Sequence, residues 1–372
     1  MFVGFERQGK DARLLAMRIL TRSNLPSGDG AIRDIPPLDG LRGLACLLVV
    51  FSHAGNQGLF YPIKGTGQIG VMLFFSLSGF LMSYLYGGSR LGAASWTGYA
   101  LKRFFRVYPA YLLVVVLSHI LYSSVGKYGF RINDAELINH ILLNGKVSIL
   151  WTIPVEMKFY AVFPLLALAI SVFQSKGAKA FAAVCILIGF FFLDLKGAKL
   201  SILPYLEFFT GGVAAGYLHA WMAKLKVDLK WVFNMVFAVS LCGLFISIPV
   251  LFKELFGFSH RYWGDGPALS SLMALCVLSC ALSTGLPNRL FSNSIARFLG
   301  NISFSLYLVH LPCIRFVKAQ LSVEPPFVLF AALAASIAVA CILHLAVERP
   351  SRNVGRYLSN VLQARWFNAA VS

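Results

Sequence analysis

The stretch LDGLRGLACLLVVFSH (residues 38–53) places an arginine near the start of an apolar run and a histidine near its end. Two prolines precede it, and proline is tolerated at the first turn of a helix, so we predict a helix here with Asp39 as its N-cap. Eleven helical residues turn by about 1100°, close to three full turns, and rise by about 16 Å. Arg42 and His53 are therefore expected on one face of this helix.

The composition places the chain in a membrane. Of its 372 residues, 58% are hydrophobic and 13% are charged, and the mean hydropathy is +0.72. A soluble domain of this composition would have too few polar side chains to cover its surface. Apolar stretches about long enough to cross a hydrocarbon core of roughly 30 Å recur along the chain, and they predict an all-α bundle of about ten transmembrane helices. The stretches are residues 43–60, 68–86, 107–125, 150–173, 180–195, 200–221, 231–252, 267–285, 299–320 and 326–347.

Basic residues predict the orientation, because loops held in the cytoplasm accumulate Lys and Arg. They cluster before the first apolar stretch, after the second and after the last: Arg7, Lys10, Arg13, Arg18, Arg22, Arg33, Arg42; Arg90, Lys102, Arg103, Arg106; Arg349, Arg352, Arg356, Arg365. Both termini are therefore predicted to be cytoplasmic, with residues 1–37 as a basic segment, 38–350 as the transmembrane domain and 351–372 as a tail. The net charge of +18 reflects this topology and contact with anionic lipid, and does not indicate nucleic-acid binding.

His53 is the first candidate functional residue. An ionisable side chain at this depth costs on the order of a few kcal/mol unless it faces the protein interior or a wet cavity, so it indicates function by default. The alternative is a histidine that only makes a hydrogen bond between helices. Arg42, at the cytoplasmic lip of the same face, either contacts a ligand or anchors the helix by reaching the lipid headgroups.

Glu156 in LWTIPVEMKFY (residues 150–160) is expected at the same depth as His53, because helix rise places both roughly 10 Å inside the outer face. A carboxylate beside an imidazole fixes the ring tautomer and strengthens the ring as a base. We therefore predict that Glu156 pairs with His53. The alternative is a structural ion pair between Glu156 and Lys158 or another basic group.

Two further apolar stretches carry polar side chains near mid-membrane. Ser76, Ser78 and Gly79 favour close helix packing, although Ser78 is also a candidate for lining a narrow passage. Tyr307 lies three residues before His310, so the two share a helix face and are further candidates for lining the site. His310 fits this role and a structural hydrogen bond between helices equally well.

Arg103 and Arg106 in RFFRVYPAY lie three residues apart on the predicted cytoplasmic side. The bias of cytoplasmic loops toward positive charge accounts for them without any ligand. Paired arginines also bind phosphates through bidentate hydrogen bonds, as the binding of an anionic cofactor requires.

Together these segments resemble the membrane-bound acyltransferase-3 family, the multispan O-acyltransferases of cell-surface and exported glycans. The matching motifs follow the family order over most of the chain: Arg-x10-His at Arg42 and His53, FFSLSGFL at 74–81, RFFRVYP at 103–109, LWTIPVEMKFY at 150–160, ISFSLYLVH at 302–310 and VERP at 347–350. No esterase-like segment follows the last apolar stretch, so the resemblance predicts the membrane-only form.

The resemblance implies transfer of an acyl group, most often acetyl, from cytoplasmic acyl-coenzyme A to a hydroxyl on the outer side. It implies a bacterial cytoplasmic (inner) membrane location, membrane lipid and a carbohydrate or lipid-linked glycan as partners, proteins of polysaccharide biosynthesis as candidate partners, and no metal. Arg42, Arg103 and Arg106 would hold the phosphates. His53 would remove the acceptor proton with Glu156 orienting its ring, and a covalent acyl-histidine is the alternative.

The chain departs from the usual family pattern in one motif. Thr152 and Pro154 replace frequent serines, and Lys158 replaces a common glutamine, so the hydrogen bonding around Glu156 is expected to differ. A proton-coupled transporter or flippase of glycans or small molecules is the rival from another class, since buried His and Glu also relay protons. A structural assembly subunit, the third alternative, leaves the matched depths of His53 and Glu156 unexplained.

Overall fold

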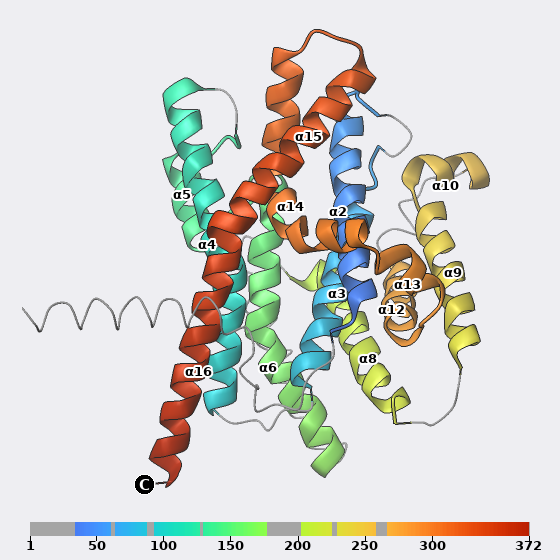
Figure 1. Cartoon of the computed structure of the whole chain (residues 1–372), viewed down its shortest axis with the longest axis vertical. Helices are drawn as coiled ribbons and strands as arrows, with labels where there is room; N and C mark the ends of the chain where they lie inside the picture. The colour runs from blue at the N-terminus through green and yellow to red at the C-terminus, as the bar shows by residue number, and fades with distance from the viewer. Residues whose placement is uncertain are drawn as a thin grey trace, which may run out of the picture. The chain divides into compact units, whose positions relative to one another are not determined.

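The computed structural model describes residues 34–60, 64–87, 93–126, 129–176, 202–224, 229–257 and 266–371. Every regular element in these ranges is helical, so the predicted all-α class is confirmed (Figure 1). The helices are α2 (Pro36–Asn56), α3 (Gly67–Tyr86), α4 (Ala93–Val125), α5 (Asp134–Ile141), α6 (Thr152–Lys176), α8 (Leu206–Met222), α9 (Lys230–Ile246), α10 (Pro249–Phe256), α12 (Pro267–Leu282), α13 (Leu286–Phe291), α14 (Ser294–Gln320), α15 (Pro325–Leu343) and α16 (Arg349–Val371). Short turns are η2 (Ser148–Trp151), η3 (Leu203–Tyr205) and η4 (His344–Glu348).

Within the described ranges, six helical segments are long and apolar enough to cross a membrane. They are Pro36–Asn56, Gly67–Tyr86, Ser95–Val125, Ser148–Val172, Ser294–Gln320 and Pro325–Trp366. A seventh arises if α9 and α10, which bend by 89° at their junction, count as one span. The predicted stretch 180–195 lies outside the described residues. A multispan protein is thus supported, while the number ten and the cytoplasmic placement of the termini stay predictions.

The first helix begins earlier than the sequence predicted. α2 starts at Pro36, so Asp39 lies inside its first turn and the predicted N-cap role of Asp39 is wrong. Proline has no N–H to leave unsatisfied at a helix start, which allows the helix to extend back to it. α2 packs against both α3 and α14 (Figure 1). It carries the candidate residues Arg42 and His53.

Helices α3 and α8 approach each other closely through small residues. A Cβ added to Gly79 would overlap the backbone of Phe209, and one added to Gly212 would overlap the backbone carbonyl of Ser76. Small residues of this kind allow membrane helices to pack backbone against backbone. The predicted packing role of the serine and glycine pattern in α3 is therefore observed at Ser76 and Gly79.

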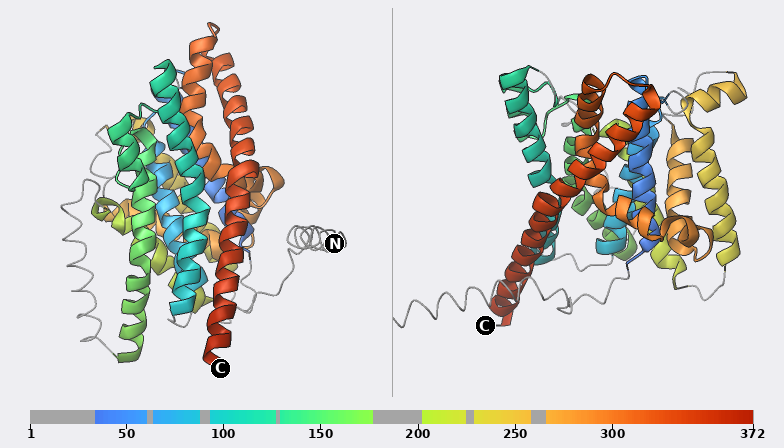
Figure 2. Two further views of the ribbon diagram at one scale, coloured as in Figure 1. Left: turned by 90° about the vertical axis from the view of Figure 1, so that its left-hand side faces the viewer. Right: turned by 45° about the horizontal axis from the view of Figure 1, so that its top comes forward.

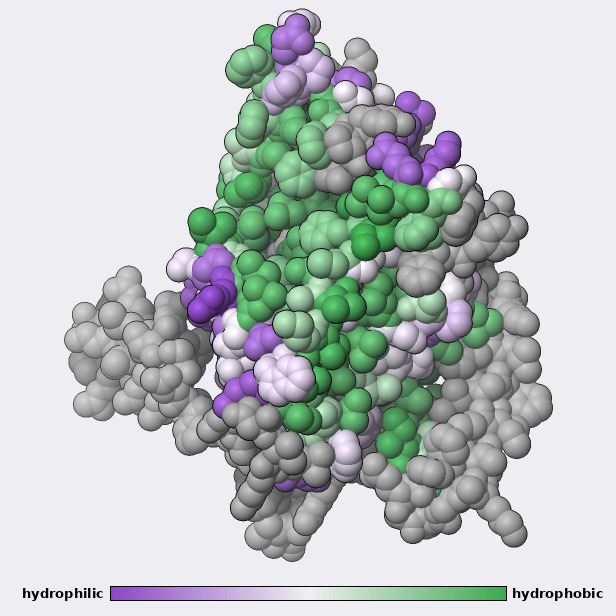
Figure 3. Space-filling model, turned by 90° about the vertical axis from the view of Figure 1, so that its right-hand side faces the viewer, coloured by the Kyte–Doolittle hydropathy of each residue, from purple (hydrophilic) through white to green (hydrophobic). Residues whose placement is uncertain are grey.

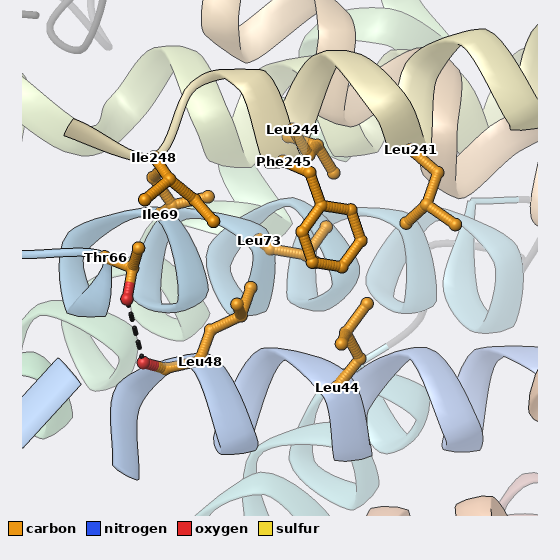
Figure 4. Close-up of a pocket in the computed structure, with 9 residues that line it drawn as sticks. All are labelled: Leu44, Leu48, Thr66, Ile69, Leu73, Leu241, Leu244, Phe245 and Ile248. Atoms are coloured by element: carbon orange, nitrogen blue, oxygen red, sulfur yellow. Dashed lines mark hydrogen bonds between the residues drawn. The ribbon is translucent and has the colours of Figure 1, made fainter. Parts of the chain in front are cut away.

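Helix α9 closes the bundle on one side of α2 and α3. Figure 4 shows Leu241, Leu244 and Phe245 of α9 facing leucines of α2 and α3, with Thr66 donating a hydrogen bond to the Leu48 carbonyl at 3.3 Å. The opposite face of α9 exposes apolar side chains, and Figure 3 shows apolar residues spread over this side of the molecule. Trp231, Met235 and Val239 are 71%, 62% and 68% exposed, as expected for a lipid-facing surface.

Helices α4 and α16 lie side by side, as Figure 2 shows. The continuous helical segment from α15 through η4 to α16 carries residues 349–366 along α4, including much of the predicted C-terminal tail. Arg352 of α16 thereby lies within electrostatic range of Arg103 and Arg106, which α4 carries.

The close contact between α3 and α8 can be tested with two variants of neighbouring glycines. Gly212→Ala is expected to reduce stability by about 1–3 kcal/mol, because its methyl group would overpack against the Ser76 carbonyl. Gly211→Ala is the control, because its Cβ would lie 3.4 Å from the Ala274 side chain in ordinary contact. The measurement is the thermal unfolding midpoint in detergent, and equal midpoints for the two variants would contradict the packing described here.

Candidate functional site

His53 and His310 meet between α2 and α14. His53 Nδ1 lies 3.2 Å from His310 Nε2, and the two ring centroids are 5.1 Å apart. His310 is completely buried, whereas His53 is partly exposed. The sequence indicated each histidine on its own helix but did not pair them, and the tertiary structure brings them into contact.

The hydrogen bonds of the two rings assign their tautomers. His310 Nδ1 lies 2.7 Å from the Tyr307 carbonyl, which can only accept, so this nitrogen carries the proton and Nε2 has the lone pair. His53 Nδ1 lies 2.9 Å from the Val49 carbonyl and therefore donates as well. The same Nδ1–H points to His310 Nε2. His53 Nε2 is left with a lone pair, which is the form that a general base requires.

His53 lines an open cavity with about 1030 Å³ of empty space, here called the His53 cavity. Its wall comes from the end of α2, the start of α3, the turns η2 and η3, and one residue of α14. The lining residues are Ser52, His53, Asn56, Gly65, Gly67, Gln68, Val71, Ser148, Ile149, Trp151, Tyr205 and Tyr307. This lining is rich in hydroxyl, amide and aromatic groups and contains no Asp, Glu, Lys or Arg.

A second cavity, here called the arginine cavity, has about 480 Å³ of empty space. It is lined by Arg42, Val71, Phe74, Phe75, Arg106, Val107, Thr152, Ile153, Glu156, Phe304 and Tyr307. Arg106 lies within electrostatic range of Arg42 and Arg103, so three like charges gather at this end of α2 and α4. The Nε atoms of Arg42 and Arg103 are buried without a hydrogen-bond partner among the described residues. Buried unpaired donors beside like charges favour an anionic ligand.

Arg103 stands behind the arginine cavity and is absent from its described lining. Its side chain is 6% exposed and donates a hydrogen bond to the Tyr86 hydroxyl at 3.3 Å. Its guanidinium lies over the rings of Tyr86 and Tyr160, 5.5 and 5.8 Å from their centroids. These contacts hold the cation in the bundle through cation–π attraction. The two arginines of the RFFR motif therefore occupy different positions, with Arg106 facing the cavity and Arg103 supporting it.

Glu156 has different partners from the one predicted. It accepts a hydrogen bond from Ser78 Oγ at 2.8 Å and a short one from the Tyr160 hydroxyl. It lines the arginine cavity together with Arg42 and Arg106. The structure thus brings Glu156 to the cationic residues and to Ser78, and brings His53 to His310.

Tyr307 lies where the two cavities adjoin, because it and Val71 line both. Its hydroxyl donates to the Ile149 carbonyl at 2.8 Å and accepts from Thr152 Oγ1 at 3.0 Å. Thr152 is one of the positions where the sequence departs from the family pattern, and its hydroxyl is used to hold Tyr307. These bonds fix the phenol between the cationic cavity and the histidine pair.

The VERP motif and the arginine that follows it extend the cationic region. The sequence predicted no role for them in the site. Glu348 is 3% exposed, accepts from Ser305 Oγ at 2.7 Å and lies 3.6 Å from Arg352 Nη1 in an ion pair. Arg352 in turn lies within electrostatic range of Arg106. The sequence signal for this arrangement is a glutamate in an apolar run followed by an arginine four residues later, which places both on one helix face.

The arrangement offers two chemical capabilities in adjoining spaces. One is a cationic cavity suited to phosphate, and the other is an imidazole with a lone pair in a cavity lined by hydroxyl and amide groups. Among the described residues, no group of three or more His, Cys, Asp or Glu side chains could hold a metal ion.

Comparison with known proteins identifies the class. The acyltransferase-3 family model, described as an acyltransferase domain, matches residues 35–345. The chain therefore belongs to the acyltransferase-3 family. The matched region contains both cavities, the histidine pair and five of the six motif segments, those from α2 to α14.

Three curated relatives illustrate the similarity. A Staphylococcus aureus strain COL protein, provisionally named an O-acetyltransferase, is 25% identical over 87% of this chain and 58% of its own length. The peptidoglycan O-acetyltransferase OatA of Listeria monocytogenes is 24% identical over 86% of this chain and 56% of its own. The O-acetyl transferase of Shigella phage Sf6 is 26% identical over 51% of this chain and 66% of its own. The chain thus spans less than two thirds of the length of the first two, and no solved structure matches it.

Proposed function

We propose that the protein is a membrane O-acyltransferase that moves an acetyl group from acetyl-coenzyme A to a hydroxyl of a carbohydrate. The observation that carries this proposal is His53, whose Nδ1–H is directed to His310 and whose Nε2 lone pair is left for the cavity that adjoins a cationic cavity. A base beside an anion-binding space is the combination that transfer from a phosphorylated thioester needs. The O-acetyltransferase names of three relatives support the same activity.

The donor enters from the cytoplasm and spans both cavities. Its phosphates bind at Arg42 and Arg106, with Arg103 and Arg352 adding positive charge behind them. Its pantetheine arm is long and narrow, and it passes Tyr307 so that the thioester reaches His53. The rise from Arg42 to His53 along α2, about 16 Å, suits an elongated ligand with its phosphates at one end and its reactive carbonyl at the other. In this proposal the protein lies in a bacterial cytoplasmic membrane, and coenzyme A binds on the basic side.

The transfer step uses His53 as a general base. Nε2 takes the proton from the acceptor hydroxyl as its oxygen attacks the thioester carbonyl. The carbon–sulfur bond then breaks, the imidazolium returns its proton to the departing thiolate, and the products are the acetyl ester and free coenzyme A. His310 accepts from the Nδ1–H throughout and stabilises the charge that His53 gains, so it is a positioning residue.

Glu156 has a compensating role in this proposal. Ser78 and Tyr160 donate hydrogen bonds to its carboxylate, which lines the same cavity as Arg106 and Arg42. It offsets the repulsion between the arginines before the donor binds. The phosphates then supply the larger counter-charge.

Removal of the base is the direct test of the reaction. His53→Gln is expected to lower acetyl transfer from labelled acetyl-coenzyme A by about 10²- to 10⁴-fold, since His53 is the one base on the described lining of the cavity. Binding of acetyl-coenzyme A is expected to stay unchanged, because the phosphates bind elsewhere. Undiminished transfer by this variant would overturn the assignment. Proton-coupled uptake without acyl-coenzyme A turnover would favour the transporter instead.

The donor site has its own test. Arg106→Ala is expected to raise the KM for acetyl-coenzyme A about 10- to 100-fold through loss of charged hydrogen bonds, with a smaller change in kcat. Arg365→Ala is the control, because this exposed arginine lies near the far end of α16. Steady-state kinetics at fixed ionic strength provide the measurement. An equal KM in both variants would exclude the arginine cavity as the phosphate site.

A comparison of two variants distinguishes a positioning role of His310 from a role in packing alone. His310→Ala is expected to lower kcat about tenfold and leave both KM values near those of the wild type, because the Nδ1–H of His53 loses one of its two acceptors and keeps only the Val49 carbonyl. His310→Gln restores much of kcat, since its carboxamide oxygen can accept from His53 Nδ1–H. Equal losses in the Ala and Gln variants at equal thermal stability would contradict this role.

A further inference from the structure

We propose that Trp151 and Tyr205 form a stacking platform in the His53 cavity for an uncharged pyranose ring of the acceptor. Asn56 and Gln68 lie on the same lining and bind the hydroxyls of that ring. The inference rests on the proposed transferase function. It adds where the acceptor sugar binds beside His53 and that this sugar is uncharged.

Trp151 and Tyr205 form an aromatic stack whose surface lines the cavity. Their centroids are 4.8 Å apart and their planes differ by 31°, so the two rings lie partly over one another in a tilted stack. Both are partly exposed and both line the cavity. They come from η2 and η3, two short turns far apart in the sequence that precede α6 and α8. Such a surface fits the flat C–H face of a sugar ring, which is apolar while its rim carries hydroxyls.

The core holds these rings in place from behind. Phe75 of α3 is 2% exposed and makes edge contacts with Trp151 at 6.3 Å and with Tyr205 at 5.7 Å between centroids. Phe75 is itself stacked on Phe209 of α8 at 4.4 Å. The buried residue thus supports two rings that are themselves partly exposed. A platform whose orientation is set before binding loses little entropy when a ligand stacks on it.

The turn that presents Trp151 has a costly backbone. Ser148, the first residue of η2, has φ of +50°, which a residue with a side chain rarely adopts and which is unfavourable. Residues held in such conformations cluster at ligand-binding sites. Ser148 lines the same cavity. The strained residue therefore lies in the same turn as Trp151, and this turn forms part of the cavity wall.

The charge of the lining selects the class of sugar. The described lining of the His53 cavity consists of amides, hydroxyls, aromatic rings, apolar side chains and glycines together with the titratable His53, and Arg315, the cation that acts on His53, lies outside that lining. A carboxylate or phosphate held there would lose hydration without a permanently charged partner on the described lining, which is unfavourable. Gly67 keeps the approach to the base open, because a Cβ there would lie 3.2 Å from Ser52 Oγ and 3.7 Å from His53 Cε1. An uncharged sugar with its hydroxyls on the rim meets these conditions.

The experiment uses the full chain in nanodiscs with labelled acetyl-coenzyme A and soluble methyl glycosides, one neutral hexoside and the corresponding uronide. The neutral hexoside is expected to be the better acceptor. Trp151→Ala and Tyr205→Ala are expected to raise the KM for it about tenfold or more and to leave the KM for acetyl-coenzyme A unchanged. Trp151→Phe keeps most of the affinity because it keeps an aromatic face. Trp231→Ala, whose ring is 71% exposed on α9, is the control and is expected to behave as the wild type.

A binding measurement that needs no turnover accompanies the kinetics. The hexoside is expected to change the tryptophan emission of the wild type and of Trp231→Phe, and not that of Trp151→Phe. An emission change that survives in Trp151→Phe, or unaltered acceptor KM values in the two alanine variants, would overturn the platform. A preference for the uronide would overturn the uncharged ligand.

Failure of the proposed function has a separate signature. If acetyl-coenzyme A does not bind and no turnover depends on His53, the transferase assignment fails, while the emission test still decides whether Trp151 binds sugar. If His53-dependent turnover of acetyl-coenzyme A proceeds but no sugar changes the emission, the transferase stands and the platform is wrong.

Discussion

The contact between His53 and His310 sets the terms for the rest of the site, because it requires two helices to meet closely enough for a buried ring and a partly exposed ring to share a hydrogen bond. Glycines make that approach possible between α2 and α14. A Cβ on Gly300 would overlap the Asp39 carbonyl, and one on Gly40 would overlap the backbone of Phe291 just before α14. The rings meet at 3.2 Å in surroundings where an unsatisfied polar group is costly. Each ring nitrogen that faces a carbonyl must then carry a proton, and this leaves one lone pair for the cavity.

The charged groups of the bundle also need partners, because an unsatisfied charge in the interior is costly. Two carboxylates, the partly buried Glu156 and the buried Glu348, accept hydrogen bonds from hydroxyl groups and lie beside arginines. The arginines themselves outnumber these carboxylates around the arginine cavity, and two of their Nε atoms lack partners among the described residues. A low-dielectric interior tolerates an excess of one charge only where a ligand of the other sign, or water, completes it. The donor phosphates fill that role in the proposed function.

The donor and the acceptor would bind in different surroundings, because arginines line one cavity and none lies on the described lining of the other. The arginine cavity is cationic and the His53 cavity is lined by uncharged groups, with Tyr307 fixed between them by hydrogen bonds to η2 and α6. A phosphorylated donor and an uncharged acceptor would therefore each be favoured at one end. The reacting atoms would meet beside the tyrosine, and His53 is the one base placed on that side within the described lining.

Local properties of the sequence were enough to predict the membrane class, the helical fold and the common face of Arg42 and His53. Hydropathy and the 3.6-residue period act within one segment, so they can be read without knowing its neighbours. The partners of Glu156 could not be predicted in this way. Equal depth suggested His53, but depth says nothing of how a helix is rotated about its axis, and packing turns Glu156 toward Ser78 and Arg106. The pairing of His53 with His310, the stacking of Arg103 on two tyrosines and the meeting of Trp151 with Tyr205 were likewise decided only by the tertiary structure. Each joins residues on different helices or turns, and only the close packing of those elements sets the distance between them.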